Sequence, residues 1–81
     1  MLCVKIRGLP YSADERQIRN FFADFRVAER DIIIDKAHGQ PTGYALVFLE
    51  SEAEALRAKN TLDREYVGNR YVDVFFPDVK K

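Results

Sequence analysis

The segment PTGYALVFLE, residues 41–50, decides the fold, because core-forming residues recur along it with a period of two. This period is typical of a β-strand that buries one of its faces. The buried face would carry Gly43, Ala45, Val47 and Leu49, and the open face Tyr44, Leu46 and Phe48. We therefore expect a sheet that is covered on one side only.

Similar patterns mark three further strands. LCVKIRG (residues 2–8) places Val4 and Ile6 on one side, and Cys3, Lys5 and Arg7 on the other. RYVDVFF (70–76) also alternates, and the short β-branched segment RDIIID (30–35) predicts another strand. The residues expected to face the core are Val4, Ile6, Ala45, Val47, Leu49, Val72 and Val74.

Two capping boxes predict two helices. SADE (12–15) makes Ser12 the N-cap with Glu15 three residues later, and SEAE (51–54) repeats the pattern. The first helix would bury the stripe formed by Ile18, Phe21, Phe22 and Phe25. The second would run to about Leu62.

The resulting order, β-α-β-β-α-β, predicts an α+β, ferredoxin-like domain over residues 2–77. Right-handed crossovers give a four-stranded antiparallel sheet of order 4-1-3-2, with both helices on one face. REYVGN (64–69) would form a loop or small hairpin, and residues 78–81 a flexible tail. Binding would then use the open face or the loops around it.

The composition limits the possible functions. Thirteen basic and thirteen acidic residues give no net charge, so non-specific binding to polyanions should be weak. The single cysteine excludes an internal disulfide, and His38 lies in a turn-rich loop. Since there is no long apolar run, we expect a soluble, intracellular protein. With one cysteine and one loop histidine, we expect no cofactor or metal.

TGYALVFL (42–49) resembles the third-strand signature of the RNA recognition motif, or RRM. It matches at Gly43, Tyr44, Ala45 and Val47 and departs at Thr42, Leu46 and Leu49. In the first strand, Lys5 stands where that family has a stacking ring. The resemblance implies the RRM fold, but only Tyr44 remains of three base-stacking positions.

RGLPY (7–11) and the later DREYVGNRY (63–71) are similar to the quasi-RRMs of the heterogeneous nuclear ribonucleoprotein F/H family. Those domains hold G-rich single-stranded RNA with loops beside the sheet. The similarity implies RNA processing, such as splicing, in the nucleus. Together with Lys5 and Tyr44 from the strands, the expected RNA-binding residues are Lys5, Arg7, Tyr11, Tyr44, Arg64, Arg70 and Tyr71. Rings and guanidinium groups would cage bases there.

Two alternatives stay open beside this one. An apolar strip of Leu46, Phe48 and Phe75 on the open face could contact a protein partner, a second copy of the chain or the chain's own tail. U2AF-homology motifs bind proteins through an R-x-F loop, which Arg64-Glu65-Tyr66 imitates weakly, but the first helix lacks their acidic face.

An enzyme is the remaining class. Acylphosphatases share the architecture, yet RGLPYS (7–12) puts a proline in the turn that would need backbone donors for phosphate. No paired acids, serine–histidine pair or metal cluster is evident, so we expect no catalysis.

Overall fold

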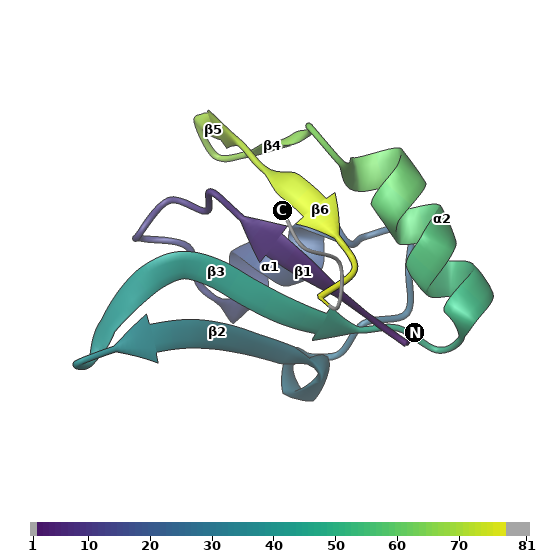
Figure 1. Ribbon diagram of the computed structural model, residues 1–81, viewed down its shortest axis with the longest axis horizontal. Coiled ribbons are helices and arrows are strands. Elements are labelled where there is room, and N and C mark those ends of the chain that lie inside the picture. The colour runs from purple at the N-terminus through teal and green to yellow at the C-terminus, as the bar shows by residue number, and fades with distance from the viewer. Residues whose placement is uncertain (1, 78–81) are drawn as a thin grey trace.

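The computed structural model describes residues 2–77. Its elements are β1 (Cys3–Arg7), α1 (Glu15–Phe21), the 3-10 turn η1 (Glu29–Asp31), β2 (Ile32–Ala37), β3 (Gln40–Phe48), α2 (Glu52–Leu62), β4 (Tyr66–Val67), β5 (Arg70–Tyr71) and β6 (Asp73–Phe75). Four strands form an antiparallel sheet in the order β2-β3-β1-β6, and both helices lie on one side of it (Figure 1). This confirms the predicted architecture and strand order.

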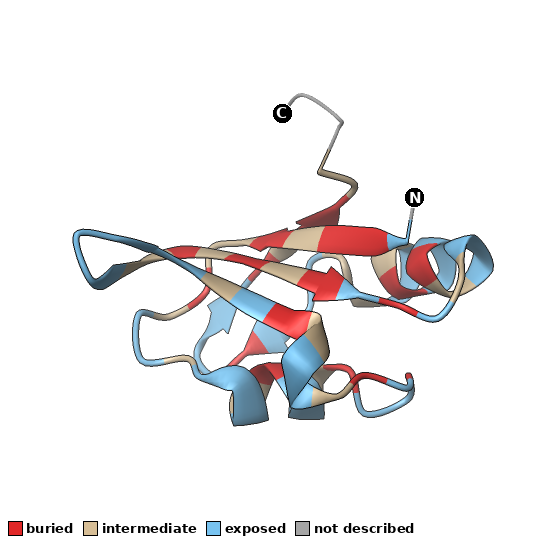
Figure 2. Ribbon diagram, turned by 90° about the horizontal axis from the view of Figure 1, so that it is seen from below, coloured by how far each residue is buried: buried red, intermediate tan, exposed pale blue. Residues whose placement is uncertain are grey.

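The core lies between the sheet and the helices, where strands and helices turn their apolar faces toward each other. Buried residues recur along the strands of the sheet (Figure 2). All seven residues predicted to face the core are buried: Val4, Ile6, Ala45, Val47, Leu49, Val72 and Val74. From the first helical stripe, Ile18, Phe22 and Phe25 are buried, and Phe21 is partly buried.

The start of α1 differs from the prediction. Asp14, not Ser12, is the N-cap, and its Oδ1 accepts a hydrogen bond of 2.9 Å from the backbone N–H of Gln17. Ser12 instead lies in a turn in which the Ala13 N–H donates to the Pro10 carbonyl at 3.0 Å. At α2 the predicted cap is confirmed, because Ser51 Oγ accepts from Glu54 N–H at 3.1 Å.

The predicted last strand, residues 70–76, is divided in two. The backbone N–H and carbonyl of Val72 pair with the Glu65 carbonyl and the Arg64 N–H, at 2.9 and 2.8 Å. Only Asp73–Phe75 then pairs with β1, whereas Arg70–Tyr71 pairs with Tyr66–Val67 in a separate hairpin. The expectation that residues 70 and 71 lie in the strand beside β1 was therefore wrong.

Arg57 joins α2 to the loop after α1. Its guanidinium donates to both carboxylate oxygens of Glu54, each at 2.8 Å, and to the Asp24 carbonyl at 3.2 Å. It also lies 4.0 Å from the centre of the Phe25 ring. The hydrogen bond from Arg57, opposed in part by desolvation, lowers the pKa of Glu54 below its ordinary value.

We expect Glu54→Gln to lower the melting temperature by at most about a few degrees at neutral pH. The folded-state pKa of Glu54 lies below its value of 4.5 without the partner, so the stabilisation is present above pH 4.5. It is lost as the pH falls through the folded-state value. Melting temperatures of wild type and variant between about pH 7 and pH 3 should therefore converge.

Glu50→Gln is the matched control, since Glu50 is exposed and has no ion pair among residues 2–77. It should leave the acid dependence of the melting temperature unchanged. An acid dependence that Glu54→Gln also leaves unchanged would contradict the assignment.

Two further expectations concern membrane-spanning helices and the C-terminal tail. No helix among the described residues is long and apolar enough to cross a membrane. The predicted tail, residues 78–81, lies outside the described residues.

Candidate functional site

On the open face of the sheet, the two basic residues of β1 lie between residues of the neighbouring strands β3 and β6. Arg7 is aligned with Tyr44 on β3 and Asp73 on β6, while Lys5 is aligned with Leu46 and Phe75. Arg7 donates from Nε and one terminal nitrogen to Asp73 Oδ2, at 3.0 and 2.6 Å. These bonds and the charge of Asp73 raise the pKa of Arg7, so the guanidinium is a permanent cation.

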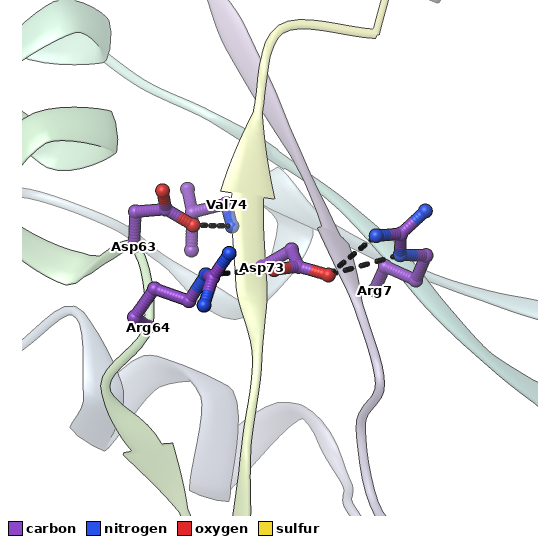
Figure 3. Close-up of polar contacts among 5 residues, drawn as sticks. All are labelled: Arg7, Asp63, Arg64, Asp73 and Val74. Carbon is purple, nitrogen blue, oxygen red and sulfur yellow. Dashed lines mark hydrogen bonds and ion pairs between the residues drawn. The ribbon is translucent and has the colours of Figure 1, made fainter. Parts of the chain in front are cut away.

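Asp73 also holds a second arginine. Its other carboxylate oxygen, Oδ1, lies 3.4 Å from Arg64 Nε, so one carboxylate stands between two guanidinium groups (Figure 3). Arg64 has a left-handed backbone, with φ of 68°. The residue before it, Asp63, accepts a hydrogen bond from Val74 N–H at 2.8 Å, which fixes this turn to β6. The 63–64 segment is thereby held against the sheet edge.

A hollow of about 550 Å³ opens beside this pair of arginines. We call it the rim; its lining residues are Arg7, Gly8, Tyr66, Asn69, Arg70, Tyr71 and Asp73. Gly8 has φ of 96°, a backbone conformation that would strain any residue with a side chain, and a Cβ there would be in ordinary contact with the Tyr71 carbonyl oxygen, 3.4 Å away. Arg70 is exposed, and no carboxylate of residues 2–77 lies within ion-pairing distance of it.

The hairpin contributes two exposed rings to the rim. Tyr66 and Tyr71 are directly opposite each other in the β4–β5 pair and meet edge to face, with ring centres 5.9 Å apart. Their exposed fractions are 65% and 56%. The sequence points to Tyr66 only as part of an R-x-F-like loop, and its exposed place beside Tyr71 was not predicted. The signal that could have identified it is the turn at Gly68, which places residues 66 and 71 across from each other.

Tyr11 lies apart from this hollow. The loop that carries it is fixed to β3, because Gly8 N–H and Leu9 N–H both donate to the Gly43 carbonyl at 3.0 Å. Its ring edge approaches the Cα side of Gly43, where an added Cβ would be 3.7 Å away, and the residue is 69% exposed. Tyr11 therefore stands beside Gly43 rather than among the residues that line the rim.

Lys5 and Tyr44 form a smaller arrangement on the sheet. The Lys5 ammonium lies 4.8 Å from the centre of the Tyr44 ring, within the range of a cation–π contact. Both residues line a hollow of about 260 Å³ with Ile33, Asp35 and Leu46. Of the seven predicted residues, the structure thus places Arg7, Arg70 and Tyr71 in one hollow, joins Arg64 to it through Asp73, and leaves Lys5, Tyr11 and Tyr44 outside it.

The predicted apolar strip on the open face is incomplete. Phe48 is 41% exposed and Leu46 is half-buried, but Phe75 is only 7% exposed. Strand alternation gives the correct face for Phe75 but does not predict its burial, which depends on neighbours from other parts of the chain. Among the described residues there is also no group of three or more histidine, cysteine or acidic side chains that could hold a metal ion.

Comparison with known proteins gives a consistent set of matches. A family model for the RRM domain matches residues 4–80. Human heterogeneous nuclear ribonucleoprotein H is 43% identical over 75 residues, which are 89% of this chain and 16% of that protein. The chain spans about 7% to 16% of the length of the curated relatives it matches.

Two solved structures are similar in both fold and sequence. The crystal structure of human G-rich RNA sequence binding factor 1 has a TM-score of 0.82 and 34% identity, covering 90% of this chain and 76% of that one. The crystal structure of the Glorund qRRM2 domain has a TM-score of 0.80 and 34% identity, covering 95% and 89%.

Proposed function

Because the chain belongs to the RNA recognition motif family, as a quasi-RRM of the heterogeneous nuclear ribonucleoprotein F/H type, we propose that it binds single-stranded RNA at the rim. The observation that carries this proposal is the hollow in which Arg7, Arg70 and Tyr71 meet. It combines an exposed ring, an arginine with no acidic partner among residues 2–77 and a second arginine that Asp73 holds in place. The domain acts by binding, without chemistry.

The chemistry of these side chains favours guanine. Tyr71 offers a ring face on which a base can stack. An arginine fork matches the paired N7 and O6 acceptors of guanine, a pairing best known from duplex DNA. Arg7 is fixed by Asp73 and suits this directional role. The charge of Arg70, which no carboxylate in the described part of the chain pairs with, suits phosphate. One solved relative is itself called a G-rich RNA sequence binding factor, which supports the same preference.

A titration followed by backbone amide shifts tests the proposal. We expect a GGG-containing hexamer to shift the amides around Arg7–Tyr11 and Arg64–Tyr71, with weaker effects from U-rich and A-rich hexamers. Shifts centred on Tyr44, Leu46 and Phe48 would instead identify the open face of the sheet as the RNA-binding surface. Absence of any response below millimolar RNA would overturn RNA binding altogether.

Protein binding at the open face is the second candidate. Ile33 and Phe48 are 52% and 41% exposed there, which leaves apolar surface outside the rim. A protein ligand would shift the amides of β2 and β3 and leave the rim unaffected. Simultaneous binding of RNA and that ligand would show that the two surfaces are separate.

We further propose that the whole protein acts in RNA processing, such as splicing, in the nucleus. The name of its relative, a heterogeneous nuclear ribonucleoprotein, supports this compartment. Crosslinking of the protein to RNA in intact cells should recover G-tracts in nuclear precursor transcripts. Recovery of cytoplasmic RNA alone would contradict the proposal.

A further inference from the structure

A second hollow lies behind the β4–β5 hairpin. It has a volume of about 400 Å³ and opens between α1 and the hairpin, with lining residues that include Gln17, Asn20, Phe21, Leu62, Glu65 and Tyr66. Figure 1 shows the hairpin beyond the start of β6, at one edge of the sheet. Apart from Tyr66, none of these six residues lines the rim. The volume falls in the range of about 300–1,000 Å³ that small-ligand sites occupy.

The walls of this hollow suit a flat ring. Phe21 and Leu62 are half-buried against the core, so part of each side chain faces the hollow. Tyr66 is 65% exposed, and its position opposite Tyr71 is fixed by the hairpin. Aromatic and apolar walls of this kind hold nucleobases by stacking and by exclusion of water.

The polar groups of the hollow come from fixed backbone positions. The Glu65 N–H donates to the Leu62 carbonyl at 3.1 Å, and its carbonyl accepts from Val72 at 2.9 Å, so its side chain leaves an anchored turn. The Gln17 amide lies against the hairpin: a Cβ on Gly68 would be 3.2 Å from Gln17 Nε2. Asn20 follows Gln17 by one turn of α1.

These groups select among bases by their hydrogen-bonding capacity. A carboxylate only accepts hydrogen bonds, and its two oxygens match the adjacent N1–H and amino group on the Watson–Crick edge of guanine. A side-chain amide can donate to the neighbouring O6. Uracil and adenine present no pair of adjacent donors, so Glu65 would lack one partner with either of them.

We propose that this hollow is a second base-binding subsite, which takes a guanine from the same RNA strand that the rim holds. The proposal rests on the proposed RNA-binding function. Tyr66 joins the two places, because it lines both the rim and this hollow. Arg16, exposed and four residues before Asn20 on the same side of α1, can hold the adjoining phosphate.

The test scans single guanosines through a strand that already occupies the rim. Affinities are measured for UUUGGGUUU and for the six nonamers in which one flanking uridine is replaced by guanosine. We expect one replacement to raise the affinity of the wild-type domain by about five- to tenfold, the low end of the discrimination that one bidentate base contact provides. That gain should disappear in Glu65→Gln, while affinity for UUUGGGUUU itself stays within about twofold of wild type.

Side-chain amide resonances give an independent readout. In the wild type, the favoured nonamer should shift the NH₂ groups of Gln17 and Asn20, and UUUGGGUUU should not. Arg70→Ala, which alters the rim, should lower the affinity for both RNAs.

The outcomes separate the two proposals. If UUUGGGUUU binds but no added guanosine raises the affinity, the subsite is overturned and the rim survives. If no RNA binds, both are overturned. Should a basic peptide, rather than RNA, shift the Gln17 and Asn20 amides, the hollow belongs to a protein partner and the subsite is again overturned.

Discussion

Replacement of Arg70 by alanine is expected to weaken binding of a GGG-containing hexamer by about ten- to hundredfold, because it removes a charge-assisted hydrogen bond. Arg70 is the rim arginine with no carboxylate within ion-pairing distance among residues 2–77, so RNA has no intramolecular acid to displace. Isothermal titration or fluorescence anisotropy at one fixed salt concentration measures the change.

Two variants control this result. Leu46→Ala, on the sheet outside the rim, should change the affinity by less than about twofold if the sheet is not the binding surface. Arg70→Lys keeps the positive charge that the proposal assigns to phosphate, and should restore part of the affinity while the preference for guanine stays near that of wild type. A larger loss with Leu46→Ala than with Arg70→Ala would contradict binding at the rim.

The core could be predicted from the sequence because burial on a sheet follows a period of two. Val4, Ile6, Val47 and Val74 needed no tertiary information, since each lies within a strand whose alternation gives its face. The same rule could not reveal where the final strand changes partner. Residues 70–76 alternate without interruption, yet Val72 pairs back to residues 64 and 65.

The cap of α1 shows a different limit. Ser12 is followed after three residues by Glu15, and Asp14 by Gln17, so the same stretch offers two matches to a capping box. The hydrogen bond from Ala13 N–H to the Pro10 carbonyl decides between them by placing Ser12 in a turn. Local sequence rules give the helix, but the preceding turn gives its first residue.

For the candidate site, the sequence could indicate residues but not how they are arranged, and their role in RNA binding stays a prediction. Arg7, Arg70 and Tyr71 were identified by resemblance, and the structure brings them to one hollow although 63 positions separate the first two. Tyr66 was missed because its exposure depends on the hairpin. The link from Arg7 through Asp73 to Arg64 also needs the register of β1 with β6, which no local pattern supplies.

Asp73→Asn is expected to reduce the preference for G-rich over U-rich RNA by about tenfold, the discrimination that one bidentate base contact provides. In the wild type, the Asp73 carboxylate contacts both Arg7 and Arg64 and neutralises part of their positive charge. Without that charge, both arginines become available to phosphate, which every sequence carries. Affinity for U-rich RNA should therefore rise while the advantage of guanine falls.

The salt dependence of binding distinguishes this effect from a loss of structure. Each added phosphate contact steepens the slope of log K against log salt by about 0.7 for a single strand, so Asp73→Asn should have a slope steeper by about 0.7 to 1.4 than wild type. Asp35→Asn makes the same charge change on the open face, where Asp35 accepts from Thr42 rather than from an arginine, and should leave slope and selectivity near wild type. If Asp73→Asn instead lowered the affinities for G-rich and U-rich RNA equally, with an unchanged slope, the role of Asp73 would be structural only. A steeper slope with lower selectivity would identify its carboxylate as the group that keeps these arginines from binding every phosphate alike.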